Sequence, residues 1–435
     1  MKFFRNIFSI SNSCDCEKKI QALQDEVNGF NNRVNANTHN IAKNREAINE
    51  LKSPLERETI NLDDVELENY SYPTTYSSYL SPRTNRYGNT VTRISDHNAF
   101  GTTSNRLGND YSQVQSWNCD ETLIKLAGKP AFIIDAQTFE PIKTVNQQGD
   151  PRWSNIYPNI IYGVSDNNFV ELDVNTNQRR TIKHFSNYIR ITLTSQGNVS
   201  NDDKMVLLVG QKSNGQYLIV YDLENNTILK EKYMNLSNLD WCSISPKGDY
   251  CLLSYNADGL GARQGMKRLD LNLENETALV NANAHNDYGL DADGSQVIVH
   301  IRMNDEIEEG YALAKTNIET GEQTLLFEWK HSEKGSWGIY GAHISMRSNV
   351  KGWAVISEGC CPNHPCLPRE IFAIKLDGSN EIIRIAKHHT DHRAGYYHEA
   401  HASVNRSFNQ VIFKSNENKQ QYKNYESAHA FVVDF

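Results

Sequence analysis

The sequence predicts a mainly β protein, in which a seven-bladed β-propeller follows an N-terminal α-helical coiled coil. Three observations predict this fold class. Apolar residues recur at alternating three- and four-residue steps through residues 20–51, a β-type repeat occurs seven times after residue 87, and the chain ends on a strand of that repeat. At 435 residues the chain exceeds the size at which one hydrophobic core stops growing, so at least two structural parts are expected.

Residues 1–16 precede the heptad pattern and combine basic and apolar residues without a signal-peptide cleavage site. We expect an attachment peptide here, and a disordered terminus is the alternative. Cys14 and Cys16 stand where a bundle of identical chains would bring its thiols together, so interchain disulfides can form there under oxidising conditions.

The coiled-coil stalk is predicted over residues 17–53. Its core positions are Ile20, Leu23, Val27, Phe30, Val34, Asn37, Ile41, Asn44, Ile48 and Leu51. The two asparagines, Asn37 and Asn44, disfavour any register or oligomer in which their amides find no partner. The pattern V-x-x-N-T-x-x-I resembles the asparagine layers of trimeric stalks in viral fibres and trimeric adhesins. The resemblance implies a homotrimer, and a dimeric or tetrameric stalk is the alternative.

Residues 54–86 are rich in Ser, Thr, Tyr, Asn and Pro and lack periodicity, which predicts a linker or collar. The composition also excludes two classes of partner. A net charge of -9, with no basic run longer than two residues, argues against nucleic acid. No apolar stretch approaches the length of a membrane span.

Residues 87–435 contain seven copies of a unit of short strands, with spacings of 36, 46, 45, 46, 56 and 58 residues, typical of propeller blades. The repeats are aligned on Trp117, Trp153, Val199, Ile244, Leu290, Met346 and Val404. Because the chain ends on a third strand, residues 90–94 can supply the missing outer strand of the last blade and close the ring. Six or eight blades are the alternatives. Cys119, Cys242 and Cys251 fall within these strands and are expected to be buried.

Equivalent positions of the innermost strands converge on the axis of a propeller. Three residues before the repeat anchors of the last three blades stand Asp287, His343 and His401, and His285 and His398 lie close to them in sequence. Imidazoles beside a carboxylate suit a Mn, Zn or Fe site. Structural histidines that bond backbone groups are the alternative.

Residues 341–413 resemble the later blades of oligogalacturonate-lyase-like propellers, through Gly341-Ala342-His343-Ile344-Ser345, the strand 370–378 and the segment 398–403. The resemblance implies that His285, His343, His398 and His401 hold a divalent metal, Mn or Zn, which binds a uronate. It also implies a basic residue that removes the proton beside the carboxylate. Arg263 is the candidate for this base or for a carboxylate clamp, and the clamp suits a permanently protonated side chain better.

Aromatic residues accompany the histidines in the loops: Trp337, Tyr340, Tyr396 and Tyr397. Flat rings beside hydrogen-bonding groups suit a sugar, so we expect these side chains and Asp287 to bind a glycan. Ordinary packing between blades is the alternative.

Two further clusters are less specific. The loop 359–366 holds Cys360, Cys361 and Cys366, for which structural zinc, a disulfide and unpaired thiols all remain open. The histidines at 388–392 are expected to be solvated on the rim.

The favoured function is a homotrimeric virion fibre or spike whose head binds a host cell-surface polysaccharide, with avidity from three copies. It would attach to other virion or tail proteins through residues 1–16 and lie at the virion surface or outside the cell. The alternative is a metal-dependent uronate lyase, and a structural collar protein is the second alternative. The sequence leaves enzymatic activity open.

Overall fold

The computed structural model describes residues 57–61, 64–65, 71, 73, 75–102, 106–128, 130–146, 149–256, 265–281, 285–303, 311–328, 342–358, 367, 369–390, 399–417 and 428–435. All of them belong to one compact unit, Arg57–Phe435. The predicted attachment peptide and coiled coil, with Cys14, Cys16, Asn37 and Asn44, lie outside the described residues. Among the described residues no helix has the length and apolar character that crossing a membrane requires.

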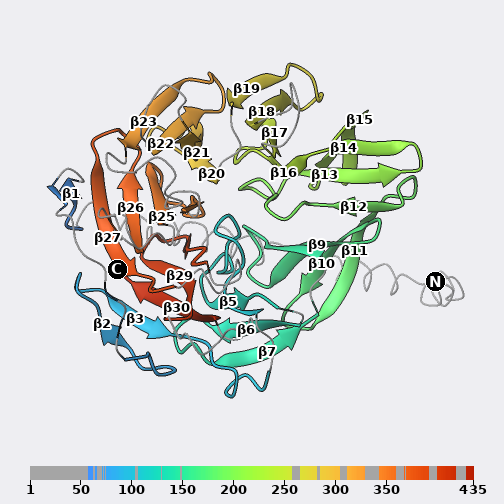
Figure 1. Cartoon of the computed structure of the whole chain (residues 1–435). Coiled ribbons are helices and arrows are strands. Elements are labelled where there is room, and N and C mark those ends of the chain that lie inside the picture. The colour runs from blue at the N-terminus through green and yellow to red at the C-terminus, as the bar shows by residue number, and fades with distance from the viewer. Residues whose placement is uncertain are drawn as a thin grey trace, which may run out of the picture. The chain divides into compact units, whose positions relative to one another are not determined.

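The described strands form seven sheets, which follow one another in chain order around a ring (Figure 1). Each sheet is one blade, so the predicted seven-bladed propeller is confirmed. The strands of each blade are given from the axis outward. Blade one contains β5 (Leu123–Leu126), β6 (Ala131–Asp135) and β7 (Pro141–Val145), and blade two contains β8 (Gly149–Trp153), β9 (Ile160–Ser165), β10 (Asn168–Asp173) and β11 (Gln178–His184). Blade three contains β12 (Arg190–Thr192), β13 (Met205–Lys212), β14 (Gly215–Asp222) and β15 (Thr227–Tyr233), and blade four contains β16 (Leu239–Ile244), β17 (Tyr250–Tyr255), β18 (Gly265–Asp270) and β19 (Thr277–Val280). Blade five contains β20 (Asn286–Leu290), β21 (Gln296–Met303), β22 (Tyr311–Asn317) and β23 (Gln323–Glu328). Blade six contains β24 (His343–Ser345), β25 (Trp353–Ser357), β26 (Glu370–Lys375) and β27 (Glu381–Lys387), and blade seven contains β28 (Ser403–Val404), β29 (Gln410–Ser415) and β30 (Ala428–Asp434).

Blade seven combines both ends of the ring. β3 (Thr90–Arg93) pairs antiparallel with β30, with Val91 opposite Val433. β2 (Arg83–Thr84) extends this sheet at its outer edge, and β4 (Arg106–Leu107) pairs with β30 in parallel. The prediction that residues 90–94 complete the last blade is therefore confirmed.

Part of the predicted linker also belongs to the ring. β1 (Ile60–Asn61) is a fifth strand of blade six and pairs with β27. Arg57, three residues earlier, donates from Nη1 to the carbonyl of Phe408 in blade seven, at 2.6 Å. This short segment thus spans the seam between the last two blades. Lack of periodicity was a poor guide here, because a two-residue strand has no period to read.

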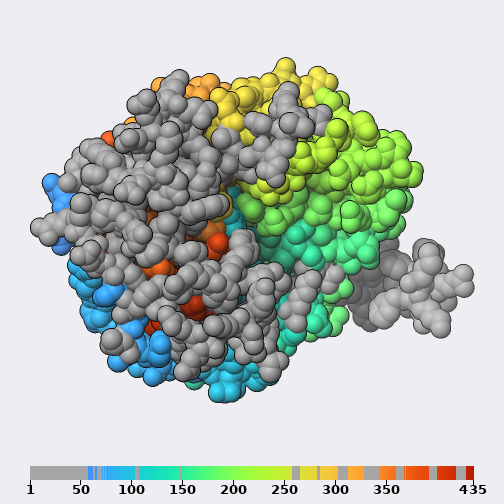
Figure 2. Space-filling model, in the orientation of Figure 1, coloured from blue at the N-terminus to red at the C-terminus, as the bar shows by residue number. Residues whose placement is uncertain are grey.

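The core lies between the blades. Buried apolar side chains of the described residues form seven clusters, each shared by two consecutive blades around the ring. β13 shows how: Val206 and Leu208 face blade two, whereas Leu207 and Val209 face blade four. Side chains alternate along a strand, so a strand between two neighbours is apolar on both faces. Figure 2 shows blades two, three and four packed side by side on one flank of the ring.

Cys242 and Cys251 lie in β16 and β17 and join one of these clusters, whereas Cys119 lies in a turn and not in a strand as predicted. Cys119, Cys242 and Cys251 are all buried, as predicted. Burial raises the pKa of the Cys242 thiol to about 12, so this group stays protonated and packs as a small apolar side chain.

Residues 108–117 cross the centre of the ring (Figure 1). Several hydrogen bonds between side chains and backbone groups join this segment to distant blades. Gln113 Nε2 donates to the carbonyl of Asn286 in blade five, and Asn198 Nδ2 in blade three donates to the carbonyl of Gln113 at 3.2 Å. We call residues 108–117 the axial segment. It places further side chains beside the histidines.

Candidate metal centre at the propeller axis

Three histidines meet near the axis, each carried at the start of an innermost strand. His285 directly precedes β20, His343 opens β24 and His401 stands two residues before β28. The imidazole rings of His285 and His343 stack with centroids 4.3 Å apart, and those of His343 and His401 meet edge to face at 4.2 Å. Consecutive blades therefore bring together three of the four histidines predicted to be ligands.

A carboxylate completes the cluster. Oε2 of Glu399 lies 3.1 Å from Nε2 of His401 and 3.4 Å from Nε2 of His343. One ligand atom from each of these three side chains can be chosen so that all lie within 4.8 Å of one another. The two histidine side chains are almost fully buried, at 1% and 2% exposed, whereas that of Glu399 is 24% exposed. The carboxylate is thus more exposed than these two imidazoles.

Hydrogen bonds orient two of the imidazoles from behind. Nδ1 of His285 lies 2.8 Å from the carbonyl of Ala342, and a carbonyl only accepts, so Nδ1 carries the proton and Nε2 keeps its lone pair. This is the tautomer of a histidine whose Nε2 binds a metal. At His401, Nζ of Lys414 lies 2.8 Å from Nδ1, so that Nε2 is the nitrogen turned to the cluster.

The axial segment covers the cluster with an aromatic ring. The ring of Tyr111 lies 5.1 Å from that of His343 and 4.8 Å from that of His401. Nδ2 of Asn109 donates to the backbone carbonyl of His401 at 2.6 Å, which fastens the segment beside blade seven. The cluster is therefore fixed by four parts of the chain.

Burial shifts the pKa values of the side chains in the cluster. Desolvation lowers the pKa of His285 and, well below its ordinary value, that of His401, where Lys414 adds to the effect. Desolvation raises the pKa of Glu399 to about 7, against the lowering influence of Lys414. At neutral pH both imidazoles are uncharged, and the carboxyl group is close to half ionised.

This donor set fits a divalent metal ion. Neutral imidazole nitrogens and one carboxylate oxygen are the ligands that Mn²⁺, Zn²⁺ and Fe²⁺ share, whereas soft thiolate chemistry is not offered by these side chains. A cation would also compensate the buried carboxylate, whose ionisation the site otherwise disfavours. His285, His343, Glu399 and His401 would hold the ion; the geometry does not distinguish between these metals.

Asp287 requires a correction. It was expected to contact a saccharide, but it is fully buried and its carboxylate serves blade-to-blade packing. It accepts the backbone N–H of Met346 at 2.6 Å and pairs with the guanidinium of Arg347 at 2.8 Å. Its position in the repeat was right, but the side chain turns toward blade six.

The expectation for the rim histidines also fails at its first member. His388 is buried, with Nε2 3.0 Å from the carbonyl of Glu358, and burial lowers its pKa well below the ordinary value. It binds backbone groups of blade six, as a structural histidine does.

The remaining predicted site residues lie outside the described residues: Arg263, Trp337, Tyr340, Tyr396, Tyr397, His398 and the loop cysteines Cys360, Cys361 and Cys366. Their assignments stay predictions.

Three residues of the cluster were not among the sequence candidates: Glu399, Tyr111 and Lys414. Glu399 stands two residues before His401, but residues 399–401 belong to no strand and His401 has a φ of 44°, so the alternation of a strand could not predict where the side chain of Glu399 points. No pattern marked Tyr111, because the axial segment has no strand period.

Comparisons with known proteins agree with this architecture. No protein-family model matches the chain, and no curated protein does. Among solved structures, an oligogalacturonate lyase in complex with manganese matches with a TM-score of 0.57 at 12% identity, covering 82% of this chain and 97% of that one. An oligogalacturonate lyase from Vibrio parahaemolyticus matches with a TM-score of 0.55 at 13% identity, covering 82% and 97%. At such identities the similarity shows the fold, a seven-bladed propeller of the kind found in these lyases.

Proposed function

We propose that the propeller holds a divalent metal ion at His285, His343, Glu399 and His401 and cleaves a uronate-containing polysaccharide as a lyase. The observation that carries this proposal is the convergence of His343, His401 and Glu399 at one end of the axis. The fold shared with two proteins named oligogalacturonate lyases, one of them a manganese complex, supports it.

The chemistry follows from the site. A bound cation would neutralise the uronate carboxylate and so acidify the adjacent C–H bond. A base takes that proton, a C=C bond forms, and the C–O bond to the leaving sugar breaks as its oxygen gains a proton. The chain's own contribution is to hold and orient: Ala342 fixes His285, Lys414 fixes His401, and the exposed side of Glu399 faces the solvent from which a polymer arrives.

Arg263 is the proposed carboxylate clamp, on the sequence resemblance alone. A permanently protonated guanidinium binds a carboxylate through two parallel hydrogen bonds, a role that asks for no proton transfer.

The fibre hypothesis rests on residues 1–53, which lie outside the described residues. It stays a prediction, with its homotrimer, its virion partners, its cell-surface polysaccharide and its location at the virion surface or outside the cell. The two functions are compatible, since a spike that carries three lyase heads would cleave the polysaccharide to which it binds.

The test uses the full chain supplied with Mn²⁺ or Zn²⁺ and incubated with polygalacturonate. A lyase generates unsaturated ends, so ultraviolet absorbance rises with time. His343→Ala together with His401→Ala should abolish both metal retention and the absorbance change, whereas His184→Ala, at an exposed histidine of β11, should change neither. Unchanged metal content in the double variant would exclude these ligands. Polymer binding without an absorbance change would identify a head that only binds.

A further inference from the structure

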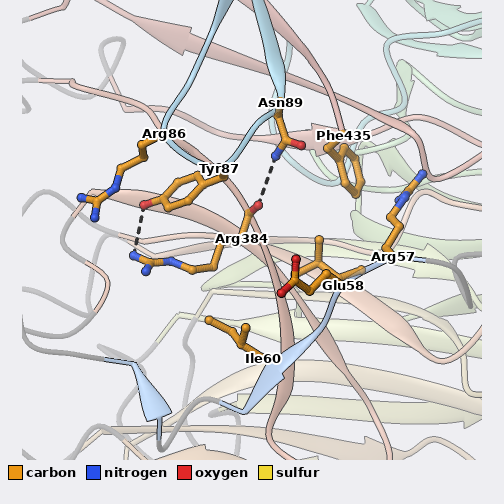
Figure 3. Close-up of a pocket in the computed structure, with 9 residues that line it drawn as sticks. Arg57, Glu58, Ile60, Arg86, Tyr87, Asn89, Arg384 and Phe435 are labelled. Atoms are coloured by element: carbon orange, nitrogen blue, oxygen red, sulfur yellow. Dashed lines mark hydrogen bonds between the residues drawn. The ribbon is translucent and has the colours of Figure 1, made fainter.

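A cavity lies at the rim of the propeller, away from the axial histidines. It has a volume of about 420 Å³ and is formed by residues around β1, the turn between β2 and β3, β27 and the last residue, Phe435 (Figure 3). The sheet order β1-β27-β26-β25-β24 places it at the outer end of blade six, whereas His343 opens β24 at the inner end. Three strand spacings separate β24 from β27, roughly 14 Å.

The cavity is lined by three guanidinium groups held against aromatic rings. Cζ of Arg57 lies 4.3 Å from the ring centre of Phe435. Those of Arg384 and Arg86 lie 4.6 Å and 5.5 Å from that of Tyr87. Figure 3 shows Arg57 and Phe435 on one side of the cavity, and Arg86 and Tyr87 on the other. Cation–π contacts fix these cations before any ligand arrives, which lowers the entropy lost on binding.

The arginines of the cavity differ in their partners. Arg384 is neutralised by Glu370, which it contacts through Nε at 2.6 Å and Nη2 at 2.7 Å. Arg57 forms no ion pair with a carboxylate of the described residues, and it donates a hydrogen bond to the neutral carbonyl of Phe408. Glu58 is exposed at the cavity wall and offers an acceptor for hydroxyl groups. Arg57 is therefore the cation of the cavity that a ligand carboxylate can pair with.

The chemistry selects a ligand. Guanidinium forks bind carboxylates in a bidentate manner, a carboxylate and amide groups suit sugar hydroxyls, and the volume is that of an ordinary small-ligand pocket. Three arginines are too few to neutralise the backbone of a nucleic acid. We propose that the rim cavity binds a carboxylate-bearing sugar unit and so retains an acidic polysaccharide beside the axial site. This inference deepens the proposed function and takes its substrate class from it.

The distance between the two sites adds a length requirement. One sugar unit cannot reach both ends of blade six, so short uronates occupy one site at a time. A longer polymer can be held at the rim while another of its units reaches the axis, and its apparent affinity gains from the second contact.

The experiment measures binding of fluorescent polygalacturonate to the full chain at low ionic strength. The reference protein carries His343→Ala and Glu399→Gln, which removes the axial site and isolates the rim. Adding Arg57→Gln and Arg86→Gln should weaken binding about tenfold or more, because two charge-assisted contacts are lost. Adding Arg179→Gln and Arg190→Gln instead, the same charge change at exposed positions of blades two and three, should alter the affinity less than about twofold.

A conservative variant separates recognition from charge and from folding. Arg57→Lys keeps the charge and loses the planar fork, so it should bind less tightly than the reference and more tightly than Arg57→Gln. Equal affinity of the reference and the rim variant, or equally tight binding of uncharged dextran, would overturn the rim proposal. Neither result bears on the axial function, whose failure shows separately as a missing absorbance change in the unaltered chain.

Discussion

Glu399 provides a test of the axial site, because its proposed role in metal binding implies that its carboxylate destabilises the metal-free protein. Its carboxyl group is mostly withdrawn from water, and burial raises its pKa from 4.5 to about 7. The unfolded chain therefore releases this proton at lower pH than the folded chain does. Stability is lost as the pH rises through this window, and the loss is complete above about pH 7.

The magnitude follows from the two pKa values. A difference between 4.5 and about 7 corresponds to about 3 kcal/mol of the free energy of unfolding at pH 8, and to less than about 1 kcal/mol at pH 5. Glu399→Gln keeps the shape of the side chain and removes its ionisation. The metal-free variant should therefore be more stable than the unaltered protein by about 3 kcal/mol at pH 8, and nearly equal to it at pH 5.

Urea unfolding of both metal-free proteins, followed by tryptophan fluorescence at pH 5 and pH 8, measures this difference. The lowered pKa values of His285 and His401 destabilise the fold on the acid side, below about 6.5, but both proteins carry them and they cancel in the comparison. Mn²⁺ should raise the unfolding temperature of the unaltered chain and leave that of the variant unchanged. Glu319→Gln, at an exposed turn, is the matched control. Equal stability of Glu399→Gln and the unaltered protein at pH 8 would refute the reasoning.

Three further outcomes are expected. Asp287→Ala should lower the free energy of unfolding by about 3–5 kcal/mol in urea titrations, because it leaves the largely buried guanidinium of Arg347 without its carboxylate. If Asp287 were exposed and unpaired, the same substitution would hardly change the free energy of unfolding. Val91→Asp should destabilise the head by at least about 3 kcal/mol, since it puts a charge into the closed seam of blade seven, and unchanged stability would contradict closure through β3. Light scattering of the full chain should return three times the mass of one chain, and Asn37→Ile with Asn44→Ile should yield mixed oligomers; a monomer mass would end the fibre hypothesis.

Repetition made most of the propeller predictable. The sequence shows apolar residues on both faces of β13, turns at regular spacing and a last blade that lacks its outer strand. β3 is that outer strand, since it pairs with β30. The axial segment, residues 108–117, was not predictable in the same way. Its position depends on side chains that bond distant blades, such as Gln113 to Asn286, and such contacts leave no periodic pattern.

The same distinction applies to the site, where positions in the repeat could be predicted and the directions of side chains could not. Alignment of the repeats brought His343 and His401 to equivalent positions, and ring geometry turned equivalence into contact at 4.2 Å. Alignment says where a residue stands and not which way its side chain turns, which is why Asp287 was assigned to a saccharide while it pairs with Arg347 inside the ring. Glu399 was not predicted because it occupies no equivalent position in the repeat, and the backbone at His401, with a φ of 44°, does not follow the alternation of a strand.

The distribution of length and chemistry around the ring points to blade six as the working part of the head. Blades two to four start 45 or 46 residues apart, whereas the intervals after blade five grow to 56 and 58 residues, and 11 of the chain's 14 histidines follow residue 280. Added length between blades fits the general placement of function in loops. The axial cluster begins at β24, one edge of this sheet, and the rim cavity is lined by residues of β27 and β1 at the opposite edge. A polysaccharide lying along blade six would thus meet fixed guanidinium groups at one end and the histidine cluster at the other.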